Sequence, residues 1–129
     1  MSVLVDSSVW IDYFRGSEKA AALDLLIEED LLAINDLILA ELVPYLRIKR
    51  QRKLLSLLHS VERISLAIDW DDLVEMQVKC IRSGINKVGI PDLIIAQNAI
   101  QNHQVLFSLD KHFGLIGGVT SLSVFGESK

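Results

Sequence analysis

Residues 2–14 read SVLVDSSVWIDYF, and this stretch decides the fold class. Its first four residues are mostly apolar, as expected for a short buried strand, and the strand ends at Asp6. Residues 7–14 then follow helical spacing, and Gly16 stops the helix. A short apolar segment followed by a longer helical pattern recurs to the end of the chain. This alternation predicts an α/β fold with a parallel sheet.

Five strands are expected, in the order 3-2-1-4-5, forming a twisted parallel sheet with helices on both faces. Pro44 should kink or end the helix in which it lies, because proline removes the backbone hydrogen bond to Ala40. The strands are expected at residues 2–5, 31–34, 61–64, 104–108 and 121–124. The helices are expected at residues 7–14, 17–29, 35 or 36 to 46, 49–59, 70–83 and 91–102, with one further turn at 110–113.

The composition narrows the class of protein. The 129 residues are half apolar, which predicts a single folded domain over residues 1–129. No apolar run is long enough for a membrane span, and no secretory signal is recognisable, so a cytoplasmic protein is expected. The single cysteine, Cys80, excludes a disulfide framework. A net charge of −4 argues against binding nucleic acid by bulk charge alone, although carboxylate-bound metal ions can still handle phosphates.

Four carboxylates occupy positions that suggest chemistry. Asp6 and Asp110 end the first and fourth expected strands, and Asp92 starts a strongly apolar helix. Glu41 lies inside LILAELV (residues 37–43), which we expect to be buried, where an unpaired charge is costly. Each also has an ordinary explanation. The aspartates can cap or stabilise helix starts, and the glutamate can extend its head to water.

Together the four acids point to a metal site. The first and fourth strands are neighbours in the expected order, and ligands bind between them at the carboxyl ends of the strands. Four clustered carboxylates repel one another unless a hard cation such as Mg²⁺ or Mn²⁺ is bound. Such an ion can activate water and stabilise the phosphate in phosphodiester hydrolysis. No zinc-type spacing of histidine and cysteine competes with this interpretation.

Four segments, taken in order, carry a family resemblance. They are DSSVWIDYF (residues 6–14), LAEL (39–42), IPDLIIAQNAI (90–100) and LFSLDKHF (106–113). They resemble the PIN domain, and within it the VapC-type toxin ribonucleases of bacterial toxin–antitoxin pairs. The resemblance covers nearly the whole chain. Each segment is weak alone, whereas the four in this order are fairly specific. Pro44, beside LAEL, departs from the unbroken helix usual in the family.

The resemblance implies a PIN-like fold and an Mg²⁺- or Mn²⁺-dependent endoribonuclease that acts on RNA. It also implies a homodimer and a small VapB-type antitoxin that blocks the acidic cleft. The metal-binding and catalytic acids of the family would fall on Asp6, Glu41, Asp92 and Asp110, with supporting hydroxyls on Ser7 or Ser8 and on Ser108.

One basic segment could offset the acidic total. Arg50, Arg52 and Lys53 are candidate RNA-phosphate contacts, and the alternatives are a solvated helix face or a surface that meets an acidic partner. Residues 36–58 are apolar enough to offer an antitoxin groove. His112 could donate a proton, but metal-bound water needs no histidine base, so no histidine is expected to be catalytic.

Other functions remain open on the sequence alone. A PIN-domain nuclease with another nucleic-acid substrate fits almost as well. A non-catalytic PIN interaction module is disfavoured, because four costly acids are retained. A phosphoryl-accepting receiver or a dehalogenase-like phosphatase fits poorly, since Asp6 is followed by Ser7 and Ser8 rather than by a second nearby acid.

Overall fold

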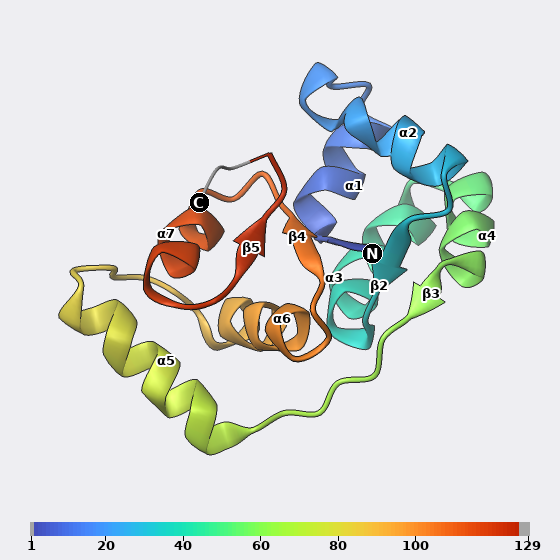
Figure 1. Cartoon of the computed structure of the whole chain (residues 1–129). Helices are drawn as coiled ribbons and strands as arrows, with labels where there is room; N and C mark the ends of the chain where they lie inside the picture. The colour runs from blue at the N-terminus through green and yellow to red at the C-terminus, as the bar shows by residue number, and fades with distance from the viewer. Residues whose placement is uncertain (1, 127–129) are drawn as a thin grey trace.

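The computed structural model of the chain describes residues 2–126. In this part of the chain, five strands form one parallel sheet in the order β3-β2-β1-β4-β5, as the sequence predicted (Figure 1). Each strand is slightly shorter than expected. The strands are β1 Val3–Val5, β2 Leu32–Ile34, β3 Glu62–Arg63, β4 Val105–Phe107 and β5 Ser123–Val124.

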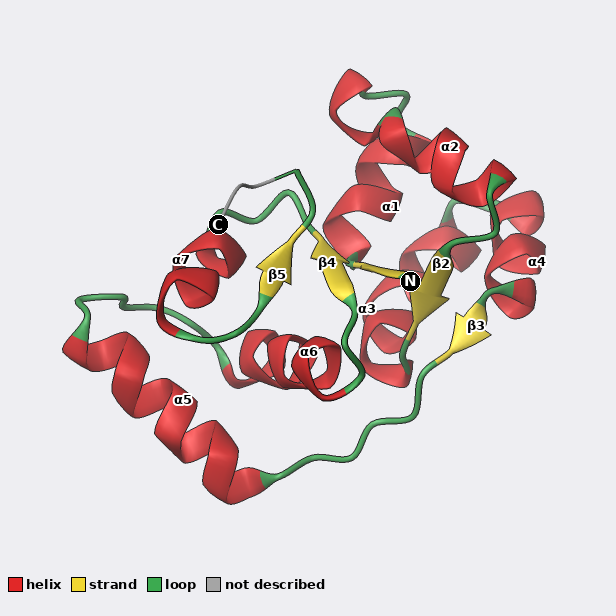
Figure 2. Ribbon diagram, viewed as in Figure 1, coloured by secondary structure: helices red, strands yellow, loops and turns green. Residues whose placement is uncertain are grey.

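Helices cover the sheet on both sides. Figure 2 shows α1 and α2 on one side of the strands and α5 and α6 on the other. No helix in residues 2–126 is long and apolar enough to cross a membrane. The helices are α1 Ser7–Phe14, the 3₁₀ helix η1 Glu18–Ala20, α2 Ala22–Glu28, α3 Asp36–Ile48, α4 Arg52–Ser60, α5 Trp70–Arg82, α6 Ile90–Gln101 and α7 His112–Val119.

The central strand β1 positions the site. Val3, Leu4 and Val5 are all buried, because β2 and β4 flank β1 and helices cover it. Val3 is in register with Leu32 of β2 and with Val105 of β4. The carboxyl ends of β1 and β4 therefore lie side by side, although about a hundred residues separate them in sequence.

Of the two effects expected at Pro44, a kink or an end of helix α3, the structure rules out the end. The helix does not end there but continues to Ile48. The proline leaves the carbonyl of Ala40 without its usual helical partner, and both residues are exposed, so water can take that place. Leu42 and Leu46, on either side, are fully buried and hold the helix to the core.

Three other helical segments also differ from the prediction. Residues 17–29 divide into η1 and α2. Residues 49–59 were expected to be helical throughout, but Arg50 has φ +55°, which interrupts the helix, and α4 begins at Arg52. The turn expected at 110–113 is the start of the longer α7, in which Phe113 and Ile116 are buried. Their packing outweighs the poor helix propensity of the glycines beside them.

Candidate metal centre

Asp6 lies at the carboxyl end of β1, beside β4. Its backbone N–H donates to the carbonyl of Phe107 at 2.9 Å, which ties it to the end of β4. Its side chain is buried, with 6% of the residue exposed. Although Asp6 occupies the position before α1, its side chain makes no capping hydrogen bond. Helix capping, the ordinary explanation of this aspartate, does not account for its carboxylate.

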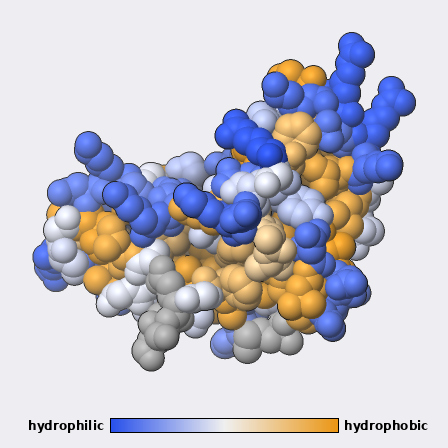
Figure 3. Space-filling view, turned by 90° about the horizontal axis from the view of Figure 1, so that it is seen from above, coloured by the Kyte–Doolittle hydropathy of each residue, from blue (hydrophilic) through white to orange (hydrophobic). Residues whose placement is uncertain are grey.

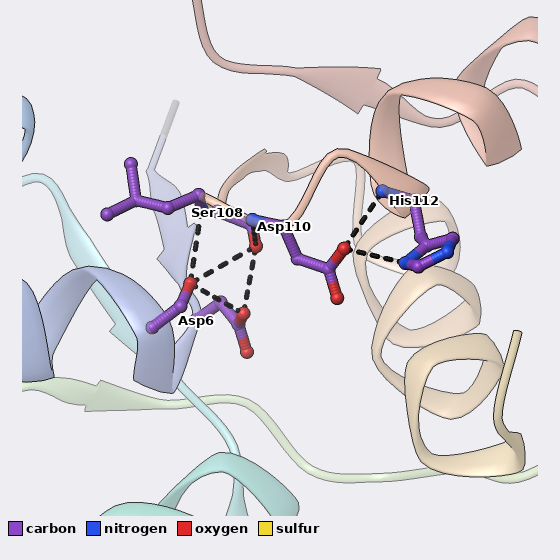
Figure 4. A network of polar contacts seen from close by, with 6 residues as sticks. Asp6, Ser108, Asp110 and His112 are labelled. Atoms are coloured by element: carbon purple, nitrogen blue, oxygen red, sulfur yellow. Dashed lines mark hydrogen bonds and ion pairs between the residues drawn. The ribbon is translucent and has the colours of Figure 1, made fainter.

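Two serine hydroxyls hold that carboxylate in place (Figure 4). Ser8 Oγ and Ser108 Oγ both donate to Asp6 Oδ2, at 3.0 and 2.8 Å, and the two hydroxyl oxygens lie 3.3 Å apart. Backbone N–H groups orient the hydroxyls, since Leu109 donates to Ser8 Oγ and Asp110 donates to Ser108 Oγ. Residues 6–8 and 108–110, which lie far apart in sequence, thus meet in one hydrogen-bonded network around Asp6.

Asp110 is held by the residue that starts α7. Its Oδ1 accepts the backbone N–H of His112 at 2.9 Å and lies 2.8 Å from His112 Nδ1 (Figure 4). The backbone contact is a local cap of the turn that follows, so capping, the ordinary explanation of this aspartate, accounts for part of its interactions. The imidazole contact was not anticipated from the sequence. It leaves Oδ2 of Asp110 without a contact to His112.

Glu41 is exposed, contrary to the expectation of a buried glutamate. The buried side of α3 is made by Ile38, Leu42 and Leu46, and Glu41 lies outside that stripe. Even so, partial burial of the carboxyl raises the pKa of Glu41, and the charges of Asp6 and Asp92 raise it further. A hydrogen bond from Ser7 acts in the opposite direction.

Asp92, in the first turn of α6, is half-buried and shares with Glu41 the influence of the Asp6 charge. Burial is the main cause that raises the pKa of Asp92, and the charges of Asp110 and Asp6 add to it. A hydrogen bond from the backbone of Gly89 and the proximity of His112 lower it. Glu41 and Asp92 thus interact with each other and with Asp6, and Asp92 also interacts with Asp110.

Apart from the imidazole of His112 beside Asp110, the four acids have no basic side chain as a partner in the described residues. In residues 2–126, no lysine or arginine forms an ion pair with any of the four acids. Carboxylate oxygens without a basic partner are the ligands that Mg²⁺ and Mn²⁺ prefer, so the donor set fits such an ion.

The side chains do not yet form a closed metal site. As they stand in the described residues, no three His, Cys, Asp or Glu side chains are arranged to hold an ion. Serine hydroxyls turn Asp6 toward Ser108, and His112 holds one oxygen of Asp110. Mutual repulsion of the acids opposes any closer approach.

The predicted RNA-contact residues lie apart from the acids. Arg50 follows α3, and Arg52 and Lys53 start α4, where all three are exposed. Figure 1 shows α4 next to β2 and β3, toward the edge of the sheet opposite β5. The structure therefore does not bring this basic segment into contact with the four acids.

The sequence did not predict a buried pair of side-chain amides, Asn35 and Asn98. Asn35 and Asn98 are 0% and 2% exposed, and Asn35 Nδ2 donates to Asn98 Oδ1 at 2.9 Å. The sequence predicted Asn35 or Asp36 as the cap of α3, and the structure shows Asn35 in that role, since its side chain accepts the N–H of Ile38. Its second partner is 63 residues away, and no local pattern reports such a contact.

Comparisons with known proteins agree with this fold. A complex of VapBC2 from Rickettsia felis with a promoter DNA fragment contains a chain with a TM-score of 0.74 and 20% identity, matching 96% of this chain and 97% of its own. FitAcB from Neisseria gonorrhoeae gives a TM-score of 0.68 at 20% identity, covering 96% of both chains. A toxin–antitoxin complex from Klebsiella pneumoniae gives 0.64 at 25% identity, covering 95% of this chain and 100% of its own.

No curated protein shows significant similarity to the chain. The family model of the PIN domain, in contrast, matches residues 3–119, which include every strand except β5 and all four acids. The chain therefore belongs to the PIN-domain family, whose members are generally nucleases.

Proposed function

We propose that this protein is a metal-dependent endoribonuclease, the toxin of a bacterial type II toxin–antitoxin system acting in the cytoplasm. The observation that carries the proposal is the cluster of interacting carboxylates beside the carboxyl ends of β1 and β4, with which no lysine or arginine of residues 2–126 forms an ion pair. Membership of the PIN family and the toxin–antitoxin complexes among the similar structures support it.

The proposed site residues are Asp6, Glu41, Asp92 and Asp110, which would bind Mg²⁺ or Mn²⁺. A bound ion would supply water activation and charge neutralisation at the scissile phosphate. The serine hydroxyls keep one oxygen of Asp6 fixed, while the imidazole and backbone of His112 fix one oxygen of Asp110. Without a cation, the same acids would repel the phosphate, so the activity should depend strictly on the metal.

The RNA would extend from this edge toward the basic segment. Arg50, Arg52 and Lys53 are exposed and offer positive charge that the acidic cluster lacks. Because these side chains lie apart from the acids, they would contact phosphates away from the cleaved bond. Such contacts position an RNA strand without reading its sequence.

The proposed protein partners are a VapB-type antitoxin and a second copy of the chain. A groove of about 150 Å³ between α3 and α4 has apolar walls with two basic side chains at its rim. Hydrophobic residues are also exposed among hydrophilic ones across the face in Figure 3, which suits partner binding. The groove is lined by Leu39, Val43, Arg47, Leu55, Leu58 and His59.

The decisive experiment is cleavage of total RNA with Mg²⁺ or Mn²⁺. Asp6→Asn and Asp92→Asn should abolish the discrete products that the wild type gives, and chelation by EDTA should do the same. Asp71→Asn, an exposed acid on α5, is the matched control and should cleave normally. Equal cleavage by all variants would indicate a contaminant. Cleavage of single-stranded DNA in place of RNA would favour a different PIN nuclease, and no cleavage of either would favour a non-catalytic module.

A further inference from the structure

Asn35 and Asn98 form a hydrogen-bonded link between α3 and α6. Besides the bond between the two side chains, Asn35 Oδ1 accepts the N–H of Ile38 at 2.9 Å, and Asn98 Nδ2 donates to the carbonyl of Ser65 at 3.0 Å. Each amide thus uses both its oxygen and its nitrogen. Such buried polar contacts fix one arrangement of their elements, because breaking them leaves desolvated groups unpaired.

The same two helices carry Glu41 and Asp92. Glu41 lies six residues after Asn35, and Asp92 lies six residues before Asn98. Six residues of helix span about 9 Å. The hydrogen bond between the amides marks one point at which α3 meets α6, and the charge interaction of Asp92 with Glu41 places the two acids near each other. With these two pairings, α3 and α6 run in opposite directions.

The contact between the amides holds α3 and α6 together, whereas the contact between the acids pushes them apart. At one end, the amides attract through a hydrogen bond, whereas at the other end Glu41 and Asp92 repel each other. Among the described residues, no other side-chain hydrogen bond joins α3 to α6. If this link is broken, the charge repulsion can separate the helices, and the acids move apart with them.

We propose that Asn35 and Asn98 are positioning residues, whose hydrogen bond sets the spacing of α3 and α6 and so keeps Glu41 and Asp92 within reach of one divalent ion. This inference rests on the proposed metal-dependent function. The residues touch neither substrate nor metal, and they act through the helices on which the acids lie.

Four variants separate this role from simple stabilisation. Asn98→Ala removes the bond from α6. Asn35→Ser removes it from α3 but keeps a side-chain oxygen that can cap the helix, since serine is as good a cap as asparagine. The double variant completes the cycle. Asn102→Ala is the matched control, because Asn102 lies at the end of the same helix and donates at 2.9 Å to a carbonyl of α6, not to α3.

The measurement is the Kd of Mn²⁺, determined by electron paramagnetic resonance in the absence of RNA. Circular dichroism confirms that each variant is folded. Each single variant should weaken Mn²⁺ binding about tenfold, as residues that orient metal ligands commonly do. The double variant should bind Mn²⁺ no more weakly than Asn98→Ala, because that change already breaks the bond between the amides together with the bond to Ser65. Asn102→Ala should bind Mn²⁺ like the wild type.

Several results would overturn the inference. They are an unchanged Kd in folded Asn98→Ala and Asn35→Ser, losses that simply add in the double variant, or an equal loss in Asn102→Ala. If Asn98→Ala does not fold, the comparison of Asn35→Ser with the control decides. A wild type that binds no Mn²⁺ would instead refute the proposed function itself, which distinguishes the two failures.

Discussion

Replacing Ser108 with alanine should lower stability by an amount that depends on the charge of Asp6. The hydroxyl donates to the buried Asp6 carboxylate at 2.8 Å and accepts the N–H of Asp110 at 3.0 Å. A hydrogen bond to a charged group contributes about 1.5–3 kcal/mol, and the variant also leaves a backbone N–H without its partner. Because Ser8 still donates to Asp6, we expect a net loss of about 2–3 kcal/mol.

The assay is thermal and urea unfolding in EDTA, so that metal binding does not contribute. A loss of this size should lower Tm by about 10 °C for a chain of this length. Ser123→Ala is the control, since Ser123 is an exposed serine on the edge strand β5, and it should shift Tm little. In an Asp6→Asn background, the hydrogen bond becomes neutral, and Ser108→Ala should then cost only about 1 kcal/mol.

The cost of Ser108→Ala in the wild type and in Asp6→Asn tests whether the hydroxyl supports the charge of Asp6. If Ser108→Ala costs the same in the wild type and in the Asp6→Asn background, the hydroxyl stabilises the fold without supporting the charge. A cost below about 0.5 kcal/mol in the wild-type background would show that the network around Asp6 contributes little.

Three further predictions concern metal, pH and salt. Mn²⁺ at a hundredfold excess over its Kd should stabilise the wild type by about 2.7 kcal/mol in urea unfolding, and Asp92→Asn should lose this gain. In EDTA, the raised pKa values of Glu41 and Asp92 make their ionisation cost stability as pH rises past their ordinary values of 4.5 and 3.8. The double variant Glu41→Gln/Asp92→Asn lacks both charges, so its free energy of unfolding should rise relative to that of the wild type as pH increases. A difference that does not change with pH would contradict this. In a triple variant, Arg50 becomes Asn, which tolerates the positive φ of that position, and Arg52 and Lys53 become Gln. The slope of the logarithm of the RNA-binding constant against the logarithm of salt concentration should fall by about 2. An unchanged slope would show that these side chains do not contact RNA phosphates.

Most of the fold could be predicted from periodicity and from residues at element ends. The alternation of short apolar runs and helical patterns located the strands, and the common order of doubly wound sheets gave the strand order that the structure shows. The apolar runs are clearest at β1 and its neighbours, which are buried. The errors lie where tertiary contacts outweigh local preference. α3 continues past Pro44 and ends at Ile48 rather than at Leu46, because flanking leucines hold the helix to the core, and α7 is longer than expected, because Phe113 and Ile116 pack inside.

The candidate site was predictable in part. Strand order alone placed Asp6 beside Asp110, and both are now seen in one network with Ser8 and Ser108. The exposure of Glu41 was not predictable from an apolar helix, because the neighbours of each face are set by the packing of the whole chain. For the same reason, the amide pair in α3 and α6 and the imidazole beside Asp110 required coordinates.

The hydrogen bond between Ser108 and Asp6 joins residues 102 positions apart in the chain. A ribosome makes the N-terminal end first, and β1 then has β2 available as a neighbour but must wait for β4. Until Ser108 has left the exit tunnel, the Asp6 carboxylate lacks one of its two hydroxyl donors, and Asp110 is absent altogether. Under the proposed function, a nascent chain that lacks Asp110 cannot assemble the metal site, so it would not cleave RNA on the ribosome that makes it.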